Sequence, residues 1–285
     1  MDTLFETMVN AIFLSSVYIL AAIGFALIFS ILRVLNFAHG VLYMVGAYVA
    51  FYVGILFKLD QWAAVLMSAI IVGLFGIFLE KFFFRRFQGS FDRSLMVSLA
   101  LILILQTAAD VTVGPQVMVM PPILSSTIKL GSISLAGERI IAIAVSVFLL
   151  SAITLLIQKT MIGQQMLAVA QDPESAVLQG ININRITAFS FLLASALAAV
   201  AGGLMGSIFI MHTYMGNLVL VKVIALVLIA GMGSIGGVFV SGLIIGSLDA
   251  TLPIFIPGAS SEVAAAVLVV IILLVRPRGL FGHEI

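Results

Sequence analysis

Apolar residues run through this chain in stretches long enough to cross a lipid bilayer. Hydrophobic residues make up 63% of the 285 residues and charged residues only 9%, whereas soluble proteins are about half apolar and a quarter charged. The apolar runs are continuous rather than alternating, which indicates transmembrane helices and not the strands of a β-barrel. The sequence therefore predicts an all-α integral membrane protein with a single transmembrane domain over residues 1–285.

A bilayer core about 30 Å thick is crossed by roughly 20 residues of helix. The run Leu218–Ala250 is too long for one span and too short for two full ones, so we expect two short spans joined at a glycine-rich centre. Together with the other runs this makes about nine membrane segments, including broken short helices. The other expected spans are Ala11–Leu32, Phe37–Phe57, Trp62–Leu79, Leu95–Ala109, Ile140–Ile157, Ile186–Met211 and Val263–Val275.

The positions of lysine and arginine orient these segments, because cytoplasmic loops carry an excess of basic residues. With the N-terminus outside and the C-terminus inside, nine of the 13 basic residues lie inside and four outside. This N-out/C-in topology makes residues 159–185 a cytoplasmic loop and residues 111–138 a loop on the outer face. The inside residues are Arg33, Lys81, Arg85, Arg86, Arg93, Lys159, Arg185, Arg276 and Arg278, and the outside ones are Lys58, Lys129, Arg139 and Lys222.

Several classes of function are excluded by what the sequence lacks. It has no cysteine, which rules out disulfides and thiolate chemistry, and its three histidines are too far apart in the chain to predict a metal site. A net charge of +1 gives no reason to expect a nucleic-acid partner. Neither a catalytic constellation nor a G-x-x-x-x-G-K-[ST] phosphate loop is present, so we expect no enzyme activity and no cofactor bound by this chain.

The polar segment Lys159–Arg185 carries the signals of two short helices. Asp172 followed by Pro173 is typical of an N-cap and a first helical residue, and Gly180 is placed as a C-cap glycine with Ile181 behind it. Such a segment between two spans predicts a docking surface. The candidate docking residues are Gln164, Gln171, Asp172, Pro173, Glu174, Ala176, Val177, Leu178 and Gly180.

The other candidate residues have a structural and a functional interpretation. Small residues recur every fourth position along Ile186–Met211, which predicts a helix-packing face and, as the alternative, the wall of a pathway. Asn36 and His39 suit capping of the second span better than contact with a substrate. The packing face consists of Ala194, Ala198, Gly202 and Gly206, and the possible pathway or gate of Asn36, His39, Gly231, Gly233, Ser234, Gly236 and Gly237.

The glycine cluster matches G-x-G-x-x-G, yet no alternating strand–helix pattern surrounds it, so we reject a dinucleotide site. We interpret it as a break between helices, tolerated at membrane depth only where protein or water surrounds it.

The segment Lys81–Arg93 alternates aromatic and basic residues, which favours an anchor at the lipid surface. The charged residues Asp110, Lys222, Asp249 and Glu262 are expected near span ends, and the scarcity of mid-span charges favours energy supplied by another subunit.

Three ordered segments resemble the permease subunits of branched-chain amino acid ABC importers, of the LivH type. They are LRVLNFAHGVLYMVGAYVA at Leu32–Ala50, QDPESAVLQGININRITAFSFLLASALAAVAGGLMG at Gln171–Gly206, and IAGMGSIGGVFVSGLIIG at Ile229–Gly246, followed by VRPRGLFG at Val275–Gly282. The resemblance implies a type II ABC importer fold in the bacterial inner (plasma) membrane, with residues 159–185 docking into a cleft of an ATPase.

The resemblance also implies partners: a second permease subunit, either LivM-type or a copy of this chain, two cytoplasmic ATPase subunits that use Mg-ATP, and a periplasmic binding protein. The implied function is uptake of leucine, isoleucine, valine or related small amino acids by alternating access. The same importer class also carries urea and short amides. A stand-alone carrier or channel, and a membrane protein with only a structural role, are the rival hypotheses of other classes.

Overall fold

A computed structural model describes residues 2–32, 35–114, 116–123, 127–130, 133–231, 233–256 and 260–282, and apolar helices account for most of them. Two of these helices are short, α9 (Met215–Ala230) and α11 (Ser261–Val275). The predicted all-α membrane bundle of about nine segments is confirmed. The helices long and apolar enough to cross a membrane are α1 (Asp2–Leu32), α2 (Ala38–Phe57), α3 (Gln61–Leu79), α4 (Phe91–Val113), α5 (Gly137–Lys159), α8 (Ile183–Ile208) and α10 (Ile235–Phe255).

Smaller elements connect these helices. A π-helical turn, η1 (Glu80–Phe84), and a 3₁₀ turn, η2 (Arg85–Phe87), extend α3, and α6 (Met161–Gln171) and α7 (Pro173–Leu178) lie between α5 and α8. Strands β1 (Thr127–Leu130) and β2 (Ile133–Ala136) form an antiparallel hairpin before α5, with Thr127 opposite Ala136. No pattern in the sequence predicted this hairpin.

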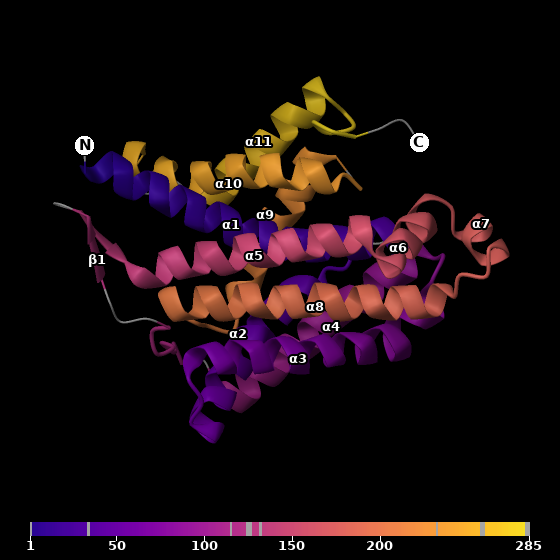
Figure 1. Cartoon of the computed structure of the whole chain (residues 1–285), viewed down its shortest axis with the longest axis horizontal. Coiled ribbons are helices and arrows are strands. Elements are labelled where there is room, and N and C mark those ends of the chain that lie inside the picture. Colours follow the sequence, from indigo (N-terminus) through magenta and orange to yellow (C-terminus); the bar gives the residue numbers. More distant parts are fainter. Residues whose placement is uncertain are drawn as a thin grey trace.

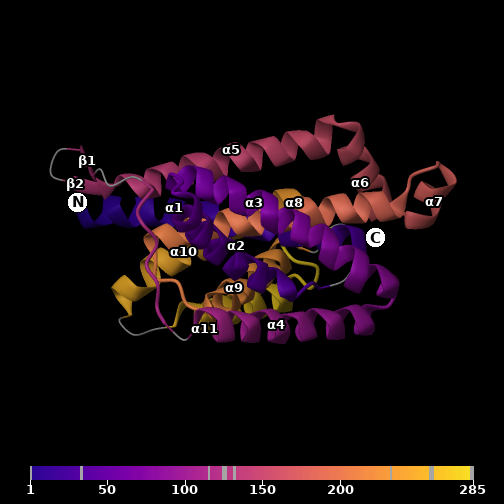
Figure 2. The same cartoon turned by 90° about the horizontal axis from the view of Figure 1, so that it is seen from below.

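The elongated bundle has two distinct ends (Figures 1 and 2). The N-terminus and the β1–β2 hairpin lie at one end, and α6, α7 and the C-terminus lie at the other. The expected cytoplasmic loop and the C-terminus are therefore on the same side of the bundle. Which side faces the cytoplasm remains a prediction. Arg33, whose charge entered that prediction, lies outside the described residues.

Several helices extend beyond the span boundaries that hydropathy predicted. The region Leu218–Ala250 is divided at its glycine-rich centre as predicted, but only α9, with 16 residues, is short, whereas α10 has 21 residues and continues past Ala250 to Phe255. The fourth span was expected at Leu95–Ala109, yet α4 has 23 residues and includes a turn beyond each boundary. The polar first turn of α4, which contains Asp92 and Arg93, does not end this helix because its backbone hydrogen bonds continue, and this is why hydropathy underestimated its length.

The centre of the bundle is formed by α1 and α8. In the most apolar stretch of α1, 89% of the residues are buried, compared with 17% in α4. Helix α8 packs against α1, α2 and α3, whereas α4 and α5 lie on the periphery (Figure 2). The exposed faces of the peripheral helices are apolar and are available to lipid or to another subunit.

Small residues allow α8 to approach its neighbours closely. A Cβ atom at Gly202 would collide with the carbonyl oxygen of Tyr43 on α2, and one at Gly206 would lie 2.8 Å from the sulfur of Met211. On α1, a Cβ atom at Gly24 would lie 2.9 Å from the carbonyl oxygen of Ala194. Lipid tails are as apolar as leucine, so helices in a membrane associate through this kind of close packing rather than through hydrophobic exclusion. This close approach agrees with the predicted helix-packing face on α8.

We expect Gly202→Ala to destabilise the bundle, because the new methyl group would push α8 away from the α2 backbone. Overpacking of this kind costs about 1–3 kcal/mol. The measurement is the apparent Tm of the detergent-solubilised protein. Gly236→Ala is the matched control, since nothing lies within 4 Å of a Cβ atom there. Equal melting temperatures for the two variants would contradict a close contact at Gly202.

Candidate functional site

The end of the bundle opposite the N-terminus carries a protruding two-helix surface formed by α6 and α7 (Figure 1). Helix α6 begins directly after α5, where the Thr160 hydroxyl accepts a hydrogen bond from the Gly163 amide at 3.1 Å. A Cβ atom at Gly163 would collide with the carbonyl oxygens of Leu156 and Ile157. Glycine at this position therefore permits the sharp turn that directs α6 away from the axis of α5.

Helix α7 is held at both ends by its caps. The Asp172 carboxylate accepts hydrogen bonds from the amides of Glu174 at 3.0 Å and Ser175 at 3.1 Å, and Pro173 occupies the first turn. Gly180 has a φ of +80°, and the Ile181 amide donates back to the helix at 3.0 Å. The predicted caps are confirmed. Because six residues are too few for a stable isolated helix, these caps keep α7 folded.

The side chains of α7 divide into a buried and an exposed set. Ala176 is only 2% exposed, whereas Leu178 is 88% exposed and Val177 is also exposed. Ala176 therefore supports α7 against the rest of the chain and does not belong to the outer surface, contrary to its place among the candidate docking residues. The remaining candidates, Gln164, Gln171, Asp172, Glu174 and Gly180, are exposed, and Pro173 is half-buried.

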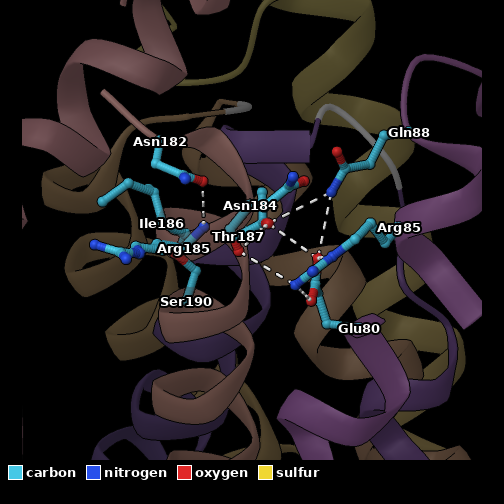
Figure 3. Close-up of polar contacts among 9 residues, drawn as sticks. All are labelled: Glu80, Arg85, Gln88, Asn182, Asn184, Arg185, Ile186, Thr187 and Ser190. Atoms are coloured by element: carbon cyan, nitrogen blue, oxygen red, sulfur yellow. Dashed lines mark hydrogen bonds and ion pairs between the residues drawn. The ribbon is translucent and has the colours of Figure 1, made fainter. Parts of the chain in front are cut away.

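An ion pair between Glu80 and Arg85, at the end of α3, is hydrogen-bonded to the start of α8 (Figure 3). The Glu80 side chain is fully buried, and its carboxylate accepts hydrogen bonds from Arg85 at 2.6 and 3.1 Å and from the Thr187 hydroxyl at 3.0 Å. Gln88 donates to both Glu80 and Thr187 at 3.4 Å, and Arg85 also reaches the carbonyl oxygen of Asn184. This Glu80–Arg85 anchor connects the end of α3 to the first turns of α8.

Part of the segment Lys81–Arg93 packs into the bundle, whereas Lys81, Phe82 and Arg86 are exposed, so contact of this segment with the lipid surface remains a prediction. Arg85 turns inward to Glu80, and the Phe84 ring is buried against the Phe191 ring of α8 with centroids 5.0 Å apart. Sequence reasoning missed the pair because residues five apart do not face each other on a regular α-helix. The wider π-helical turn at Glu80–Phe84 changes the register and brings the two side chains together.

Asn36 and His39, two of the possible pathway residues, lie in the contact between α1 and α2. The Asn36 side chain accepts a hydrogen bond from the Ala38 amide at 3.1 Å, which caps the start of α2. The His39 ring pairs through Nε2 with the carbonyl oxygen of Ala21 on α1 at 2.9 Å. Both side chains are buried. This geometry agrees with the capping interpretation, and a role in the pathway remains a prediction.

The glycine break separates α9 from α10. Gly231 and Gly233 have φ values of +91° and +92°, a backbone region that favours glycine. The Ser234 hydroxyl then caps α10 by accepting a hydrogen bond from the Gly237 amide at 3.1 Å. Gly236 faces open space. No strand–helix unit surrounds these residues in the described part of the chain, so the G-x-G-x-x-G pattern has no nucleotide-binding context here.

The C-terminal segment covers this break. The amides of Leu280 and Phe281 donate hydrogen bonds to the carbonyl oxygens of Ile229 and Ala230 at 2.8 and 3.0 Å. A Cβ atom at Gly231 would lie 2.7 Å from the carbonyl oxygen of Arg278. The backbone groups released where α9 ends are thus satisfied by protein, one of the two conditions under which a break is tolerated at membrane depth.

A second ionic cluster joins residues that the sequence placed at separate span ends. The Lys222 ammonium of α9 lies 2.7 and 3.0 Å from the two carboxylate oxygens of Asp249 on α10 and 3.5 Å from Glu262 on α11. The Tyr18 hydroxyl of α1 accepts from Lys222 at 3.2 Å and donates to Asp249 at 2.6 Å. In the sequence, the only indication of this cluster was the presence of opposite charges in successive apolar helices.

We expect Glu80→Gln to weaken the anchor, because it leaves the Arg85 guanidinium without its carboxylate. Removing one partner of a buried ion pair costs about 3–5 kcal/mol, and the 31% exposure of the Arg85 side chain reduces that figure to about 1–3 kcal/mol. The apparent Tm in detergent is the measurement, with the exposed carboxylate of Asp92 changed to asparagine as the control. A Tm unchanged by Glu80→Gln would argue against an energetically important anchor.

Comparison with known proteins agrees with this architecture. The family model described as the permease component of branched-chain amino acid transport systems matches residues 7–276. The high-affinity branched-chain amino acid transport system permease protein LivH of Salmonella typhimurium is 30% identical, over 98% of this chain and 95% of that protein. Permease protein BraD of Pseudomonas aeruginosa is also 30% identical, with the same coverage.

A solved structure shares the fold. PsaBC from Streptococcus pneumoniae, determined in complex with Fab, matches with a TM-score of 0.52 over 96% of this chain and 93% of that one. The identity of 15% limits this likeness to the fold. With the family model covering nearly the whole sequence, the chain belongs to the permease components of branched-chain amino acid transport systems.

Proposed function

We propose that this chain is the membrane-spanning permease subunit of a binding-protein-dependent ABC importer for branched-chain amino acids in the inner membrane. Separate cytoplasmic ATPase subunits that use Mg-ATP drive alternating access, and a periplasmic binding protein delivers the substrate. The observation that carries the proposal is α7, a capped helix that exposes Leu178 at the end of the bundle. The family membership of the chain and the absence of a phosphate loop support it.

The surface of α6 and α7 has the chemistry of a docking site. Leu178 and Val177 present apolar area to solvent, which marks an interaction site in a segment that is otherwise polar. Exposed Met161 and Leu167 add apolar area on α6. An ATPase groove lined by apolar and polar side chains would bury these groups, as amphipathic helices are recognised by grooves in other complexes.

The Glu80–Arg85 anchor would couple a movement of α7 to the membrane helices. Helix α8 begins at Ile183, shortly after α7 ends, and its first turns are fastened to α3 through Glu80, Arg85 and Thr187. Packing along α8 then extends the contact to α1 and α2. A displacement of α7 would therefore move α8 and α3 together, as alternating access by rocking of packed helices requires.

The orientation of the chain in the membrane follows from the proposed partners. Docking on cytoplasmic ATPases places α6, α7 and the C-terminus inside and the N-terminus and the β1–β2 hairpin outside. This orientation agrees with the excess of basic residues in the predicted inner loops. The outer loop and hairpin are then available to the binding protein. The second permease subunit, LivM-type or a copy of this chain, would pack against an exposed apolar face of the bundle.

We expect Leu178→Asp to uncouple the permease from its ATPase, because docking would bury a carboxylate without a partner. The amount of ATPase that co-purifies in mild detergent, and the substrate-stimulated ATP hydrolysis of the assembled complex, should fall by about tenfold or more. The variant should fold normally, since this side chain is 88% exposed.

Leu178→Met is the matched control, because it keeps an apolar side chain of similar volume, and its coupling should be normal. Ala176→Asp should instead lower the Tm, because Ala176 is buried. Normal co-purification and hydrolysis with Leu178→Asp would refute docking through α7. Uptake by the chain alone in liposomes without ATP would refute the importer function altogether.

The proposed orientation predicts which residues an impermeant thiol reagent reaches. The chain has no cysteine, so single cysteines can be introduced without a background signal. Asp60→Cys lies in the exposed turn between α2 and α3, and Gln179→Cys lies exposed after α7. In intact spheroplasts, a maleimide that cannot cross the membrane should label only the first variant. Labelling of the second variant alone would reverse the orientation.

A further inference from the structure

The Lys222 cluster lines a cavity of about 350 Å³ that the docking function does not use. Side chains from α1, α2, α8, α9, α10 and α11 surround it, together with the segment that follows α8. It lies toward the end of the bundle that carries the N-terminus, because Asn10 and Leu14 belong to the first half of α1. Its volume is in the range of small-molecule sites.

The charges in this cavity are not balanced among themselves. Lys222 provides one positive charge, while Asp249 and Glu262 provide two negative charges. Asn10 adds a buried side-chain oxygen that has no hydrogen-bond partner among the described residues. A purely structural ion pair of Lys222 with Asp249 would need neither the second carboxylate nor this acceptor. The cavity therefore offers spare acceptors for a positively charged group.

The three ionic contacts differ in strength. Lys222 and Asp249 are 9% and 10% exposed and lie 2.7 Å apart, whereas Glu262 is 30% exposed and lies 3.5 Å from Lys222. Glu262 also accepts a hydrogen bond from the Ser260 hydroxyl at 2.7 Å, which positions its carboxylate at the start of α11. The Lys222–Glu262 contact is thus the one that a ligand can open at least cost.

The rest of the cavity wall is largely apolar. Aliphatic, methionine and aromatic side chains lie beside the charged cluster, and His212 adds a polar group near the end of α8. A ligand that fits must combine a charged head with an apolar side chain. The apolar lining residues include Leu14, Met205, Phe209, Met215, Leu218 and Val219.

We propose that this cavity is a transient site for a zwitterionic apolar amino acid, whose head group inserts between Lys222 and Glu262. The ligand ammonium would bind Glu262 and the side-chain oxygen of Asn10, and the ligand carboxylate would take the hydrogen bond that Lys222 releases. Insertion of a zwitterion leaves the charge of the cavity unchanged and gives each charge an opposite neighbour. This inference rests on the proposed importer function and specifies its substrate class.

The proposed exchange selects among the substrates that the sequence left open. Urea and short amides are neutral, so they cannot replace the ion pair that Glu262 and Lys222 lose when they separate, even though Lys222 keeps its contact with Asp249. An amine has no carboxylate to bind Lys222, and a carboxylic acid has no ammonium group to bind Glu262. Only a ligand with both charges, together with an apolar side chain, matches the whole cavity.

Ligand-observed saturation-transfer NMR on the purified complex, without the binding protein, tests the proposal with four probes. L-leucine should bind, 3-methylbutylamine and 4-methylpentanoate should bind at least about tenfold more weakly, and urea should give no specific signal. The expected ratio corresponds to the loss of one charge-assisted hydrogen bond. Equal binding of leucine and either singly charged analogue would overturn the proposal, and so would leucine binding no better than urea.

Glu262→Gln should weaken leucine binding by at least about tenfold, because the amide cannot pair with an ammonium as a carboxylate does. Asn10→Ala should also weaken it, and this change breaks no hydrogen bond of the Asn10 oxygen, which has no partner among the described residues. Glu6→Gln is the matched control, an exposed carboxylate on the first turns of α1. Leucine affinity unchanged in both cavity variants would contradict the assignment.

Uptake measurements separate the failure of this inference from the failure of the proposed function. Proteoliposomes with the complete complex and the binding protein should take up leucine when ATP is supplied, and Glu262→Gln should reduce uptake per ATP hydrolysed. No ATP-dependent uptake by the unaltered complex would defeat the proposed function. ATP-dependent uptake that Glu262→Gln leaves undiminished would defeat only the cavity site.

Discussion

The close approach of backbones along α8 is the contact on which the rest of the molecule depends. Gly202 accepts the α2 backbone at a distance that leaves no room for a methyl group, and Ala194 and Gly24 allow a similar contact with α1. In lipid, where burial of apolar groups gives little driving force, these contacts supply the packing energy of the bundle. Because α8 begins at Ile183, shortly after α7 ends at Leu178, a central helix of the bundle is connected closely to the docking surface.

The parts of the fold that depend on local chemistry were predictable from the sequence. Continuous apolar runs predicted the spans, and Asp172, Pro173 and Gly180 predicted both ends of α7 because capping involves residues only two or three positions apart. The spacing of Gly202 and Gly206 likewise predicted a packing face, since a helix has a fixed period. Topology was inferred from charge placement alone and is still a prediction.

The two ionic clusters could not be predicted in the same way. Glu80 meets Arg85 only through a π-helical turn, and no sequence pattern specified that turn. Lys222, Asp249 and Glu262 come from three successive helices, and their meeting depends on the packing of α9, α10 and α11. The burial of Ala176 also depends on where α7 rests against the chain. Hydropathy and capping carry no information about such tertiary contacts.

Residues 279–281 cover the α9–α10 break. This contact has a consequence for the order in which the helices are integrated into the membrane. The carbonyl oxygens of Ile229 and Ala230 emerge from the ribosome before α10 and α11, whereas their donors, the amides of Leu280 and Phe281, follow α11. During biosynthesis these acceptors must be hydrated or held by other groups until α11 has been inserted. Closure of the break is therefore a late step of membrane integration. The helix pair α9–α10 reaches its final structure only after α11 has been inserted.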